Sequence, residues 1–221
     1  MKLSILIPVF NEEPQILELL RRVAAVDLEK EIIVVDDCST DRSWELINSV
    51  QIPELRAIRH PVNQGKGAGI QTALREATGD VVIIQDADLE YSPEEYPKLL
   101  APLQRQEADV VYGARDLSGQ RAIIKFGNRF LTFVTNLLYG SHLTDMETCY
   151  KVIPTQLMRS LQLKADRFQI EPEITAKLLR RGCRIVEVPI SYTPRKQKKL
   201  NPWRDGLPAL QMLIRCRLER I

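Results

Sequence analysis

One stretch decides the fold of this chain: Gly79-Asp80-Val81-Val82-Ile83-Ile84-Gln85-Asp86-Ala87-Asp88-Leu89-Glu90. Its uninterrupted apolar, β-branched run predicts a strand that is buried on both faces. The strand ends in carboxylates, and the carboxyl ends of the strands form the ligand crevice of an open α/β sheet. We therefore expect Asp86 and Asp88, with Glu90, to link a hard cation, Mg²⁺ or Mn²⁺, to the oxygens of a diphosphate. The alternative is a solvated acidic turn in which Asp88 or Ser92 caps the following helix.

Strands and helices alternate along the rest of the chain. The spacing of apolar residues predicts strands at residues 3–9, 31–35, 55–59, 108–112 and 183–192, besides the strand that begins at residue 80. It predicts helices at residues 14–26, 93–106, 123–139, 168–181 and 203–221, and two more that end near residues 50 and 78. Single helices between successive strands indicate βαβ units and a parallel, doubly wound sheet. At 221 residues, 44% of them hydrophobic, the chain fits one large α/β domain.

Composition excludes several classes of protein. The four cysteines are far apart and form no CxxC pair, which favours reduced thiols, an intracellular location and no zinc site. With two histidines in the chain, a histidine-based triad is not expected. The apolar opening segment is too short for a secretory signal, and no apolar stretch reaches the roughly 18 residues of a membrane span. Nucleic acid is not an expected partner either, since no nucleic-acid motif accompanies the basic residues.

Charge is distributed unevenly along the chain, whose net charge is +2. Residues 195–221 contain eight Lys and Arg against two Asp and Glu, a net +6, which leaves −4 for residues 1–194. The basic C-terminal segment is therefore suited to phosphate groups or to an anionic membrane surface.

A glycine-rich turn, Asn63-Gln64-Gly65-Lys66-Gly67-Ala68-Gly69, precedes one of the predicted helices. It fails the dinucleotide fingerprint because Ile70 stands where a glycine is required, and it fails the P-loop pattern because Gly67 follows Lys66. What remains is a lysine at a helix N-terminus, a suitable place to hold a phosphate or a ribose. The alternative is a turn that only permits close helix packing.

Four motifs follow one another in the first half of the chain: Pro8-Val9-Phe10-Asn11-Glu12, Val34-Val35-Asp36-Asp37-Cys38-Ser39-Thr40-Asp41, Asn63-Gln64-Gly65-Lys66-Gly67 and Asp86-Ala87-Asp88-Leu89. In this order they resemble the inverting family 2 glycosyltransferases, above all the dolichol-phosphate mannosyltransferases and the bacterial polyprenyl-phosphate glycosyltransferases. The resemblance continues through Tyr112-Gly113-Ala114-Arg115, Thr144-Asp145 and Tyr192 to Gly206. It implies one GT-A type, Rossmann-like α/β domain over residues 1–221, with a mostly parallel sheet flanked by helices.

Within that domain, the resemblance implies that residues 1–115 bind the nucleotide sugar. Pro8, Phe10 and Glu12 would line the base and ribose pocket, and Asp37 would hydrogen-bond the base edge. The residues' own positions leave alternatives open: Phe10 in the core, Glu12 in a first helical turn and Asp37 as a capping residue. Lys66, from the glycine-rich turn, is also predicted to contact the nucleotide sugar.

The resemblance also implies how the diphosphate is held. Asp86, Asp88 and Glu90 would bind the metal, although relatives often have Gln at the last of these positions. A basic loop would close over the phosphates, and its residues are Arg195, Lys196, Lys198 and Lys199. The alternative is a solvated basic loop. The metal would stabilise the charge that develops on the leaving diphosphate.

Residues 116–221 would bind the acceptor and carry an amphipathic helix. In the resembling family, arginines at the positions of Arg115 and Arg129 meet a lipid phosphate. Asp145 completes the predicted catalytic set of Asp86, Asp88, Arg115 and Asp145, with three roles open: a base for a hydroxyl acceptor, a group that positions the sugar, or a capping residue. A phosphate acceptor is largely anionic at pH 7 and needs no base.

The helix predicted at residues 123–139 has two interpretations. Its apolar residues recur at helical spacing: Phe126, Phe130, Phe133, Val134, Leu137 and Leu138. Either this face packs on the sheet, or the helix enters the edge of a bilayer while Arg129 and Arg115 receive the acceptor phosphate.

The leading functional hypothesis is a metal-dependent inverting hexosyltransferase that uses a GDP- or UDP-linked sugar and a membrane polyprenyl phosphate. Such an enzyme would be cytoplasmic and peripheral to the cytoplasmic face of the membrane. Two alternatives stay open: the same chemistry on a soluble or glycan hydroxyl, and a non-catalytic protein that binds nucleotide sugars.

Overall fold

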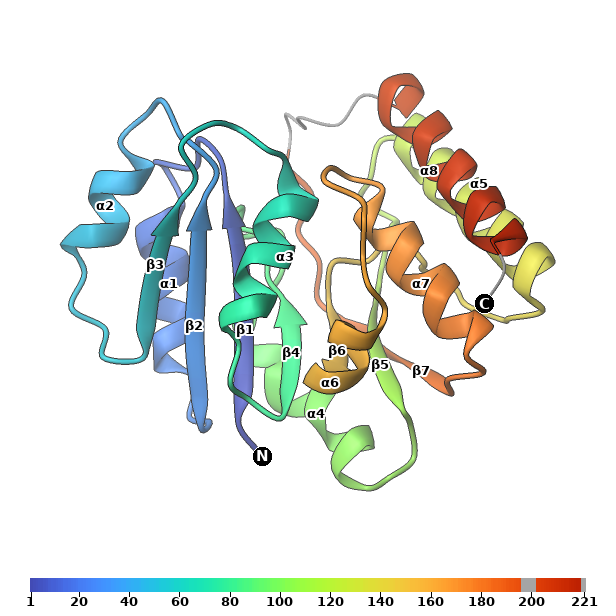
Figure 1. Ribbon diagram of the computed structural model, residues 1–221, viewed down its shortest axis with the longest axis horizontal. Helices are drawn as coiled ribbons and strands as arrows, with labels where there is room; N and C mark the ends of the chain where they lie inside the picture. The colour runs from blue at the N-terminus through green and yellow to red at the C-terminus, as the bar shows by residue number, and fades with distance from the viewer. Residues whose placement is uncertain (196–201, 220–221) are drawn as a thin grey trace.

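The computed structural model describes residues 1–195 and 202–219, without the side chains of residues 202–205. Within this part of the chain, one seven-stranded sheet runs through the molecule with helices on both faces (Figure 1). The strands are β1 (Leu3–Val9), β2 (Lys30–Asp36), β3 (Leu55–Arg59), β4 (Val81–Ile84), β5 (Val110–Arg115), β6 (Lys151–Pro154) and β7 (Ile185–Ile190). The helices are α1 (Ile16–Ala25), α2 (Ser43–Ser49), α3 (Lys66–Glu76), η1 (Pro93–Glu95), α4 (Tyr96–Gln104), α5 (Ala122–Tyr139), α6 (Thr155–Ser160), α7 (Ile170–Arg180) and α8 (Pro202–Leu218).

The strand order is β3-β2-β1-β4-β6-β5-β7. β1 lies between β2 and β4 and is parallel to both, so the carboxyl ends of these three strands share one edge of the sheet. Side chains that follow these strands are thereby brought together, as the sequence predicts. The α/β class and the mostly parallel sheet are confirmed.

One strand departs from the predicted parallel, doubly wound arrangement. β6 is antiparallel to both of its neighbours, β4 and β5, and neither β6 nor α6 was predicted from the sequence. The physical reason is that β6 is four residues long and begins with Lys151, a polar residue that masks the apolar pattern. Lys151 is nevertheless buried, because its ammonium donates to the carbonyl oxygens of Met146 and Thr148 and lies 4.8 Å from the centre of the Tyr112 ring.

Other boundaries agree closely with the predictions. β1 and β3 have the predicted bounds, and the remaining predicted strands are shifted by one to three residues at their ends.

The alternative in which Asp88 or Ser92 caps the helix after the acidic motif is wrong. η1 has no side-chain cap hydrogen bond, and Asp88 Oδ1 instead accepts from the backbone N–H of Glu90 at 3.2 Å.

Three helices gather beyond the β5 and β7 end of the sheet. α5 and α8 lie side by side, and α7 packs against both (Figure 1). The buried side chains of α5 are Leu131, Thr132 and Thr135, not the predicted aromatic row. The first interpretation of this helix, in which its aromatic face packs on the sheet, is therefore wrong.

The N-terminus of α3 is fixed by close backbone packing. The N–H of Ala68 donates to the carbonyl oxygen of Asp166 at 3.0 Å. A Cβ atom at Gly67 would collide with the carbonyl oxygen of Ala165 and lie 2.8 Å from the carbonyl carbon of Asp166. Close packing is therefore one reason for the glycine, and it holds Lys66 in place.

Gly67→Ala is expected to lower the free energy of unfolding by about 1–3 kcal/mol, because backbone atoms must move apart. Gly127→Ala is the matched control, since no atom lies within 4 Å of its added Cβ and it stands inside α5. That control should be neutral or raise stability by about 0.5–1 kcal/mol. Urea unfolding followed by circular dichroism measures both changes, and equal effects of the two substitutions would contradict this account.

Candidate active site

The acidic motif lies immediately after β4, which ends at Ile84. The side chains of Asp86 and Asp88 are 25% and 22% exposed, so both reach the surface at the carboxyl edge of the sheet. Leu89, between Asp88 and Glu90, has φ 56°, a left-handed conformation that leucine rarely adopts. The turn is thus under local strain at the point where it aims the carboxylates.

Lys66 links the acidic motif to α7. Its Nζ lies 2.6 Å from Asp86 Oδ1 and 2.6 Å from Glu171 Oε1. Burial lowers the pKa of Lys66, but the charges of Asp86 and Glu171 outweigh burial and hold that pKa well above its ordinary value. Burial likewise raises the pKa of Asp86, yet the neighbouring ammonium leaves it lowered overall. Lys66 and Asp86 are therefore both charged at neutral pH.

Arg195 occupies the other side of the acidic motif. Its Nη2 donates to Glu12 Oε2 at 2.6 Å, and its Nε lies 3.5 Å from Asp88 Oδ2. Glu90 faces the same segment, since its carboxylate accepts from the Tyr192 hydroxyl at 2.6 Å and from the backbone N–H of Arg195 at 2.7 Å. Of the predicted basic loop, Lys196, Lys198 and Lys199 lie outside the described residues.

The predicted metal ligands are therefore only partly assembled. Among residues 1–195 and 202–219, no group of three or more His, Cys, Asp or Glu side chains could hold a metal ion by itself. Asp86 and Asp88 leave the same turn, whereas both oxygens of Glu90 are hydrogen-bonded to the segment at residues 192–195.

Asp37 organises the glycine-rich turn. Its carboxylate accepts from the backbone N–H groups of Gln64 at 2.8 Å and Gly65 at 2.7 Å, and it lies 2.7 Å from His60 Nδ1. The carboxylate is almost completely buried. Asp37 thereby joins the end of β2 to the start of α3.

The remaining predicted donor-side residues follow β1. Pro8 belongs to β1 itself, and Glu12 precedes α1 by four residues, so Glu12 does not lie in a first helical turn. The Phe10 side chain is 38% exposed, so it is not part of the core. The structure places these residues at the same sheet edge as the acidic motif, because β1 lies beside β4.

Arg115 and Asp145, which the sequence assigns to the predicted catalytic set, form a two-point ion pair. Arg115 Nε and Nη2 donate to the two carboxylate oxygens of Asp145 at 2.6 and 2.7 Å, and the Arg115 backbone N–H donates to Oδ2 at 3.1 Å. The guanidinium also lies 5.3 Å from the centre of the Tyr192 ring. Asp145 is 2% exposed, and both of its oxygens accept hydrogen bonds from Arg115, so the pair fixes the orientation of that arginine.

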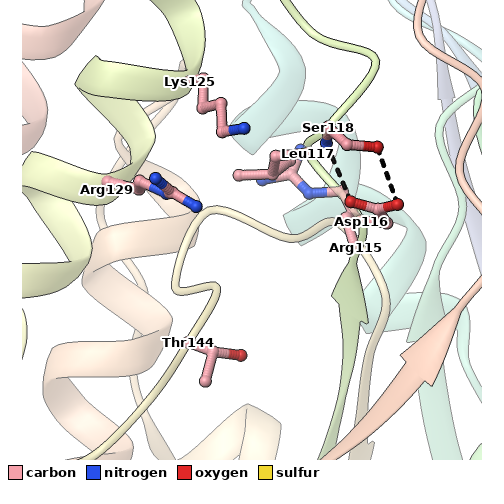
Figure 2. Close-up of a pocket in the computed structure, with 7 residues that line it drawn as sticks. All are labelled: Arg115, Asp116, Leu117, Ser118, Lys125, Arg129 and Thr144. Carbon is pink, nitrogen blue, oxygen red and sulfur yellow. Dashed lines mark hydrogen bonds between the residues drawn. The ribbon is translucent and has the colours of Figure 1, made fainter.

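A cavity of about 200 Å³ opens beside this pair. Lys125 and Arg129 extend from α5 toward the loop that carries Leu117 and Ser118 (Figure 2). The full lining comprises Arg115, Asp116, Leu117, Ser118, Lys125, Arg129 and Thr144. The structure thus brings together the two arginines predicted from the sequence.

Lys125 is a site residue that the sequence analysis missed. It stands four residues before Arg129, so the two cations share one side of α5. Neither side chain makes a hydrogen bond or an ion pair with the residues that the structure describes, whereas Arg115 is neutralised by Asp145. The i, i+4 spacing of two cations was the available sequence signal, but only the fold shows that both side chains face a cavity.

Glu147 is a second missed residue. Burial raises its pKa to about 7, and the charge of Glu171 acts in the same direction, while Lys151 and Arg115 oppose it. Its Oε1 is buried and has no hydrogen-bond partner among the described residues. Nothing in the local sequence distinguishes this glutamate, since its neighbours are contributed by other elements.

Comparisons with known proteins agree with this geometry. The family described as "Glycosyl transferase family 2" matches residues 4–158. The dolichol-phosphate mannosyltransferase of Pyrococcus furiosus is 29% identical over 202 residues, which are 87% of this chain and 56% of that protein. The undecaprenyl-phosphate mannosyltransferase of Micrococcus luteus is 28% identical over 209 residues, which are 89% of this chain and 85% of that protein. The chain thus spans about half of the first relative and most of the second.

A solved structure shares the fold over the whole chain. Glucosyl-3-phosphoglycerate synthase from Mycobacterium tuberculosis, in complex with Mn²⁺, UDP and glucosyl-3-phosphoglycerate, superposes with a TM-score of 0.81 at 19% sequence identity. The alignment covers 100% of this chain and 81% of that protein. The predicted GT-A type fold is confirmed. The chain is a glycosyltransferase and belongs to glycosyl transferase family 2.

Proposed function

We propose that this glycosyltransferase moves a hexose from a nucleotide sugar to a polyprenyl phosphate at a membrane surface. The observation that carries the proposal is the position of α5. One side of this helix supplies Lys125 and Arg129 to the cationic cavity, and another side exposes a row of apolar side chains. The names of the relatives from Pyrococcus furiosus and Micrococcus luteus, which specify polyprenyl-type phosphates, support the same acceptor.

The residues at the donor side fit a divalent metal. Asp86 and Asp88 offer two carboxylates, and Mg²⁺ commonly uses one or two carboxylates together with substrate phosphates and water. Related structures that contain Mn²⁺ or Mg²⁺ with UDP support this assignment. When bound, the metal would act as a Lewis acid that stabilises the charge of the departing diphosphate.

The chain's own residues then hold the nucleotide. Phe10 and Glu12, beside Pro8, are proposed to line the base and ribose pocket, because they follow β1 at the sheet edge that carries the acidic motif. Asp37 Oδ2 accepts one hydrogen bond, from Gly65, and has capacity for another from a base edge. Lys66 would stabilise phosphate charge from the position where it holds Asp86.

On the acceptor side, the cavity supplies positive charge to a phosphate nucleophile. A phosphate monoester is largely dianionic at pH 7, so it can attack the anomeric carbon without a base. Asp145 then acts through Arg115 rather than on the acceptor. The second candidate, a soluble or glycan hydroxyl acceptor, would require Asp145 as the base, and the two-point pair with Arg115 makes that arrangement less favourable. The non-catalytic alternative does not fit membership of this enzyme family.

The exposed apolar row is proposed to contact the bilayer. It consists of Ile123, Phe126, Phe130, Phe133 and Leu137, which are between 46% and 73% exposed. Leu207, Ile214 and Leu218 of the neighbouring α8 are exposed as well. No helix in the described part of the chain has the length and apolar character of a membrane span. Apolar side chains beside basic ones are typical of helices that lie in the membrane interface, which supports peripheral attachment. The cytoplasmic face remains part of the proposal.

Asp88→Asn is expected to abolish the Mn²⁺-dependent thermal stabilisation by the preferred GDP- or UDP-sugar and to reduce transfer by about 10²–10³-fold. The reason is that the metal loses a carboxylate ligand, so the charge on the leaving diphosphate is no longer stabilised. Screening the wild type against GDP- and UDP-sugars with Mn²⁺ first identifies the donor. Asp27→Asn, at an exposed position, is the control. Undiminished transfer by the Asp88 variant would refute the metal site.

Lys125→Ala and Arg129→Ala are each expected to raise the KM for polyprenyl phosphate by about tenfold, since each removes one charge-assisted contact with the phosphate. The affinity for nucleotide and Mn²⁺ should not change. Arg105→Ala, at the exposed residue that follows α4, is the control for lost charge. If both cavity variants keep the wild-type KM, the acceptor phosphate binds elsewhere.

Phe126→Ser combined with Phe133→Ser is expected to weaken binding to vesicles that contain anionic lipid by at least about tenfold, because two exposed aromatic rings no longer leave water. Vesicle flotation measures the bound fraction. Val62→Ser is the matched control, being 61% exposed in the loop after β3. Thermal unfolding should be unchanged in both proteins, and equal vesicle binding would contradict membrane contact by α5.

A further inference from the structure

Arg195 lies where the donor-binding carboxylates converge. Its guanidinium contacts Glu12 at 2.6 Å and lies 3.5 Å from the Asp88 carboxylate, and its Nε also donates to the Asp88 carbonyl oxygen at 3.2 Å. Its side chain is 20% exposed, so most of it is withdrawn from solvent. The contact of Arg195 with Glu12 spans 183 positions of the chain, and its contact with Asp88 spans 107. Both contacts therefore depend on the assembled fold.

A second set of contacts holds the backbone of this segment. Glu90 accepts from the backbone N–H of Arg195 and from the Tyr192 hydroxyl, and its own carbonyl oxygen accepts from the N–H of Thr193 at 2.9 Å. Tyr192 also forms a β-bridge with Tyr91. Glu90 is therefore a positioning residue that fastens the segment from Tyr192 to Arg195 against the acidic motif.

The charges of this region require a cation. Glu12 and Asp88 are partly buried carboxylates, and carboxylates removed from water are stable only when they are paired. On the Asp86 side, the ammonium of Lys66 provides the pairing, and on the Asp88 side the guanidinium of Arg195 does so. A divalent metal on Asp88 would add two positive charges close to that guanidinium, and like charges at such separations repel.

We propose that Arg195 is the resident cation of Glu12 and Asp88 in the donor-free protein, and that it leaves Asp88 for the diphosphate when metal and nucleotide bind together. This inference rests on the proposed function. The metal alone must displace Arg195 without offering it a new partner. The metal with a diphosphate replaces the pairing of Asp88 and supplies phosphate oxygens for the guanidinium. Arg195 therefore weakens metal binding in the absence of nucleotide and strengthens it in the presence of nucleotide.

Arg195→Gln tests this inference, because it should change the affinity for Mn²⁺ in opposite directions without and with nucleotide. With MnCl₂ alone, the variant is expected to bind Mn²⁺ about tenfold more tightly than the wild type, the change that corresponds to one lost charge-assisted hydrogen bond. With Mn²⁺ and saturating GDP or UDP, the variant is expected to bind about tenfold more weakly. The electron paramagnetic resonance signal of free Mn²⁺ measures both affinities without any catalytic turnover.

Two further variants separate the contact from general charge effects. Arg21→Gln removes the same charge at an exposed position on α1, and it should match the wild type in both measurements. Arg195→Lys keeps the charge but loses the planar, two-point geometry, so it should fall between the wild type and Arg195→Gln. Thermal unfolding without ligands checks that each variant is folded.

The inference is overturned if Arg195→Gln binds Mn²⁺ alone no more tightly than the wild type, including the case in which neither protein binds it at millimolar concentration. Failure of the proposed donor site has a different signature. In that case the wild type itself shows no joint binding of Mn²⁺ with either nucleotide, whatever the variant does.

Discussion

Compensation of carboxylate charge at the ends of β1 and β4 is the constraint on which the site depends. Lys66 bridges Asp86 and Glu171, so a single ammonium joins the acidic motif to α7. Arg195 provides the same compensation for Glu12 and Asp88 from the opposite side. Removing either cation would take an ion-pair partner from buried or half-buried carboxylates, which is a costly change in a folded protein. The elements that frame the candidate site are thus held together by the same charges that are proposed to take part in the chemistry.

Much of the fold could be predicted because its strands have strong local signals. The apolar run at residues 81–84 is continuous, and β1 and β3 have their predicted bounds. β6 could not be predicted, since its first residue, Lys151, is buried only through carbonyl oxygens that the folded loop supplies. The outward face of α5 was equally hidden, because periodicity shows that a helix has two faces and does not show which one meets the core.

The places of several candidate site residues in the fold were predictable, and their contacts were less so. Asp86, Asp88, Arg115 and Arg129 lie where the motifs indicated, at the edge of the sheet or in the cationic cavity. The pairing of Arg115 with Asp145 spans 30 positions, and that of Lys66 with Glu171 joins α3 to α7. Such partners carry no local pattern. Glu147 was missed for the same reason, because other elements supply its neighbours. Lys125 had a local signal in its spacing from Arg129, but only the fold shows that both face a cavity.

Helix α5 carries both the cations of the cavity and the exposed aromatic row on its 18 residues. A helix with its side chains is about 10–12 Å across, so the two features lie on different sides of one such cylinder. In the proposed membrane-bound state, the height of the cavity above the hydrocarbon would be set by one rigid helix instead of by the docking of two parts. A lipid headgroup would need to rise only about one helix width to be received, and its tail could remain in the leaflet throughout.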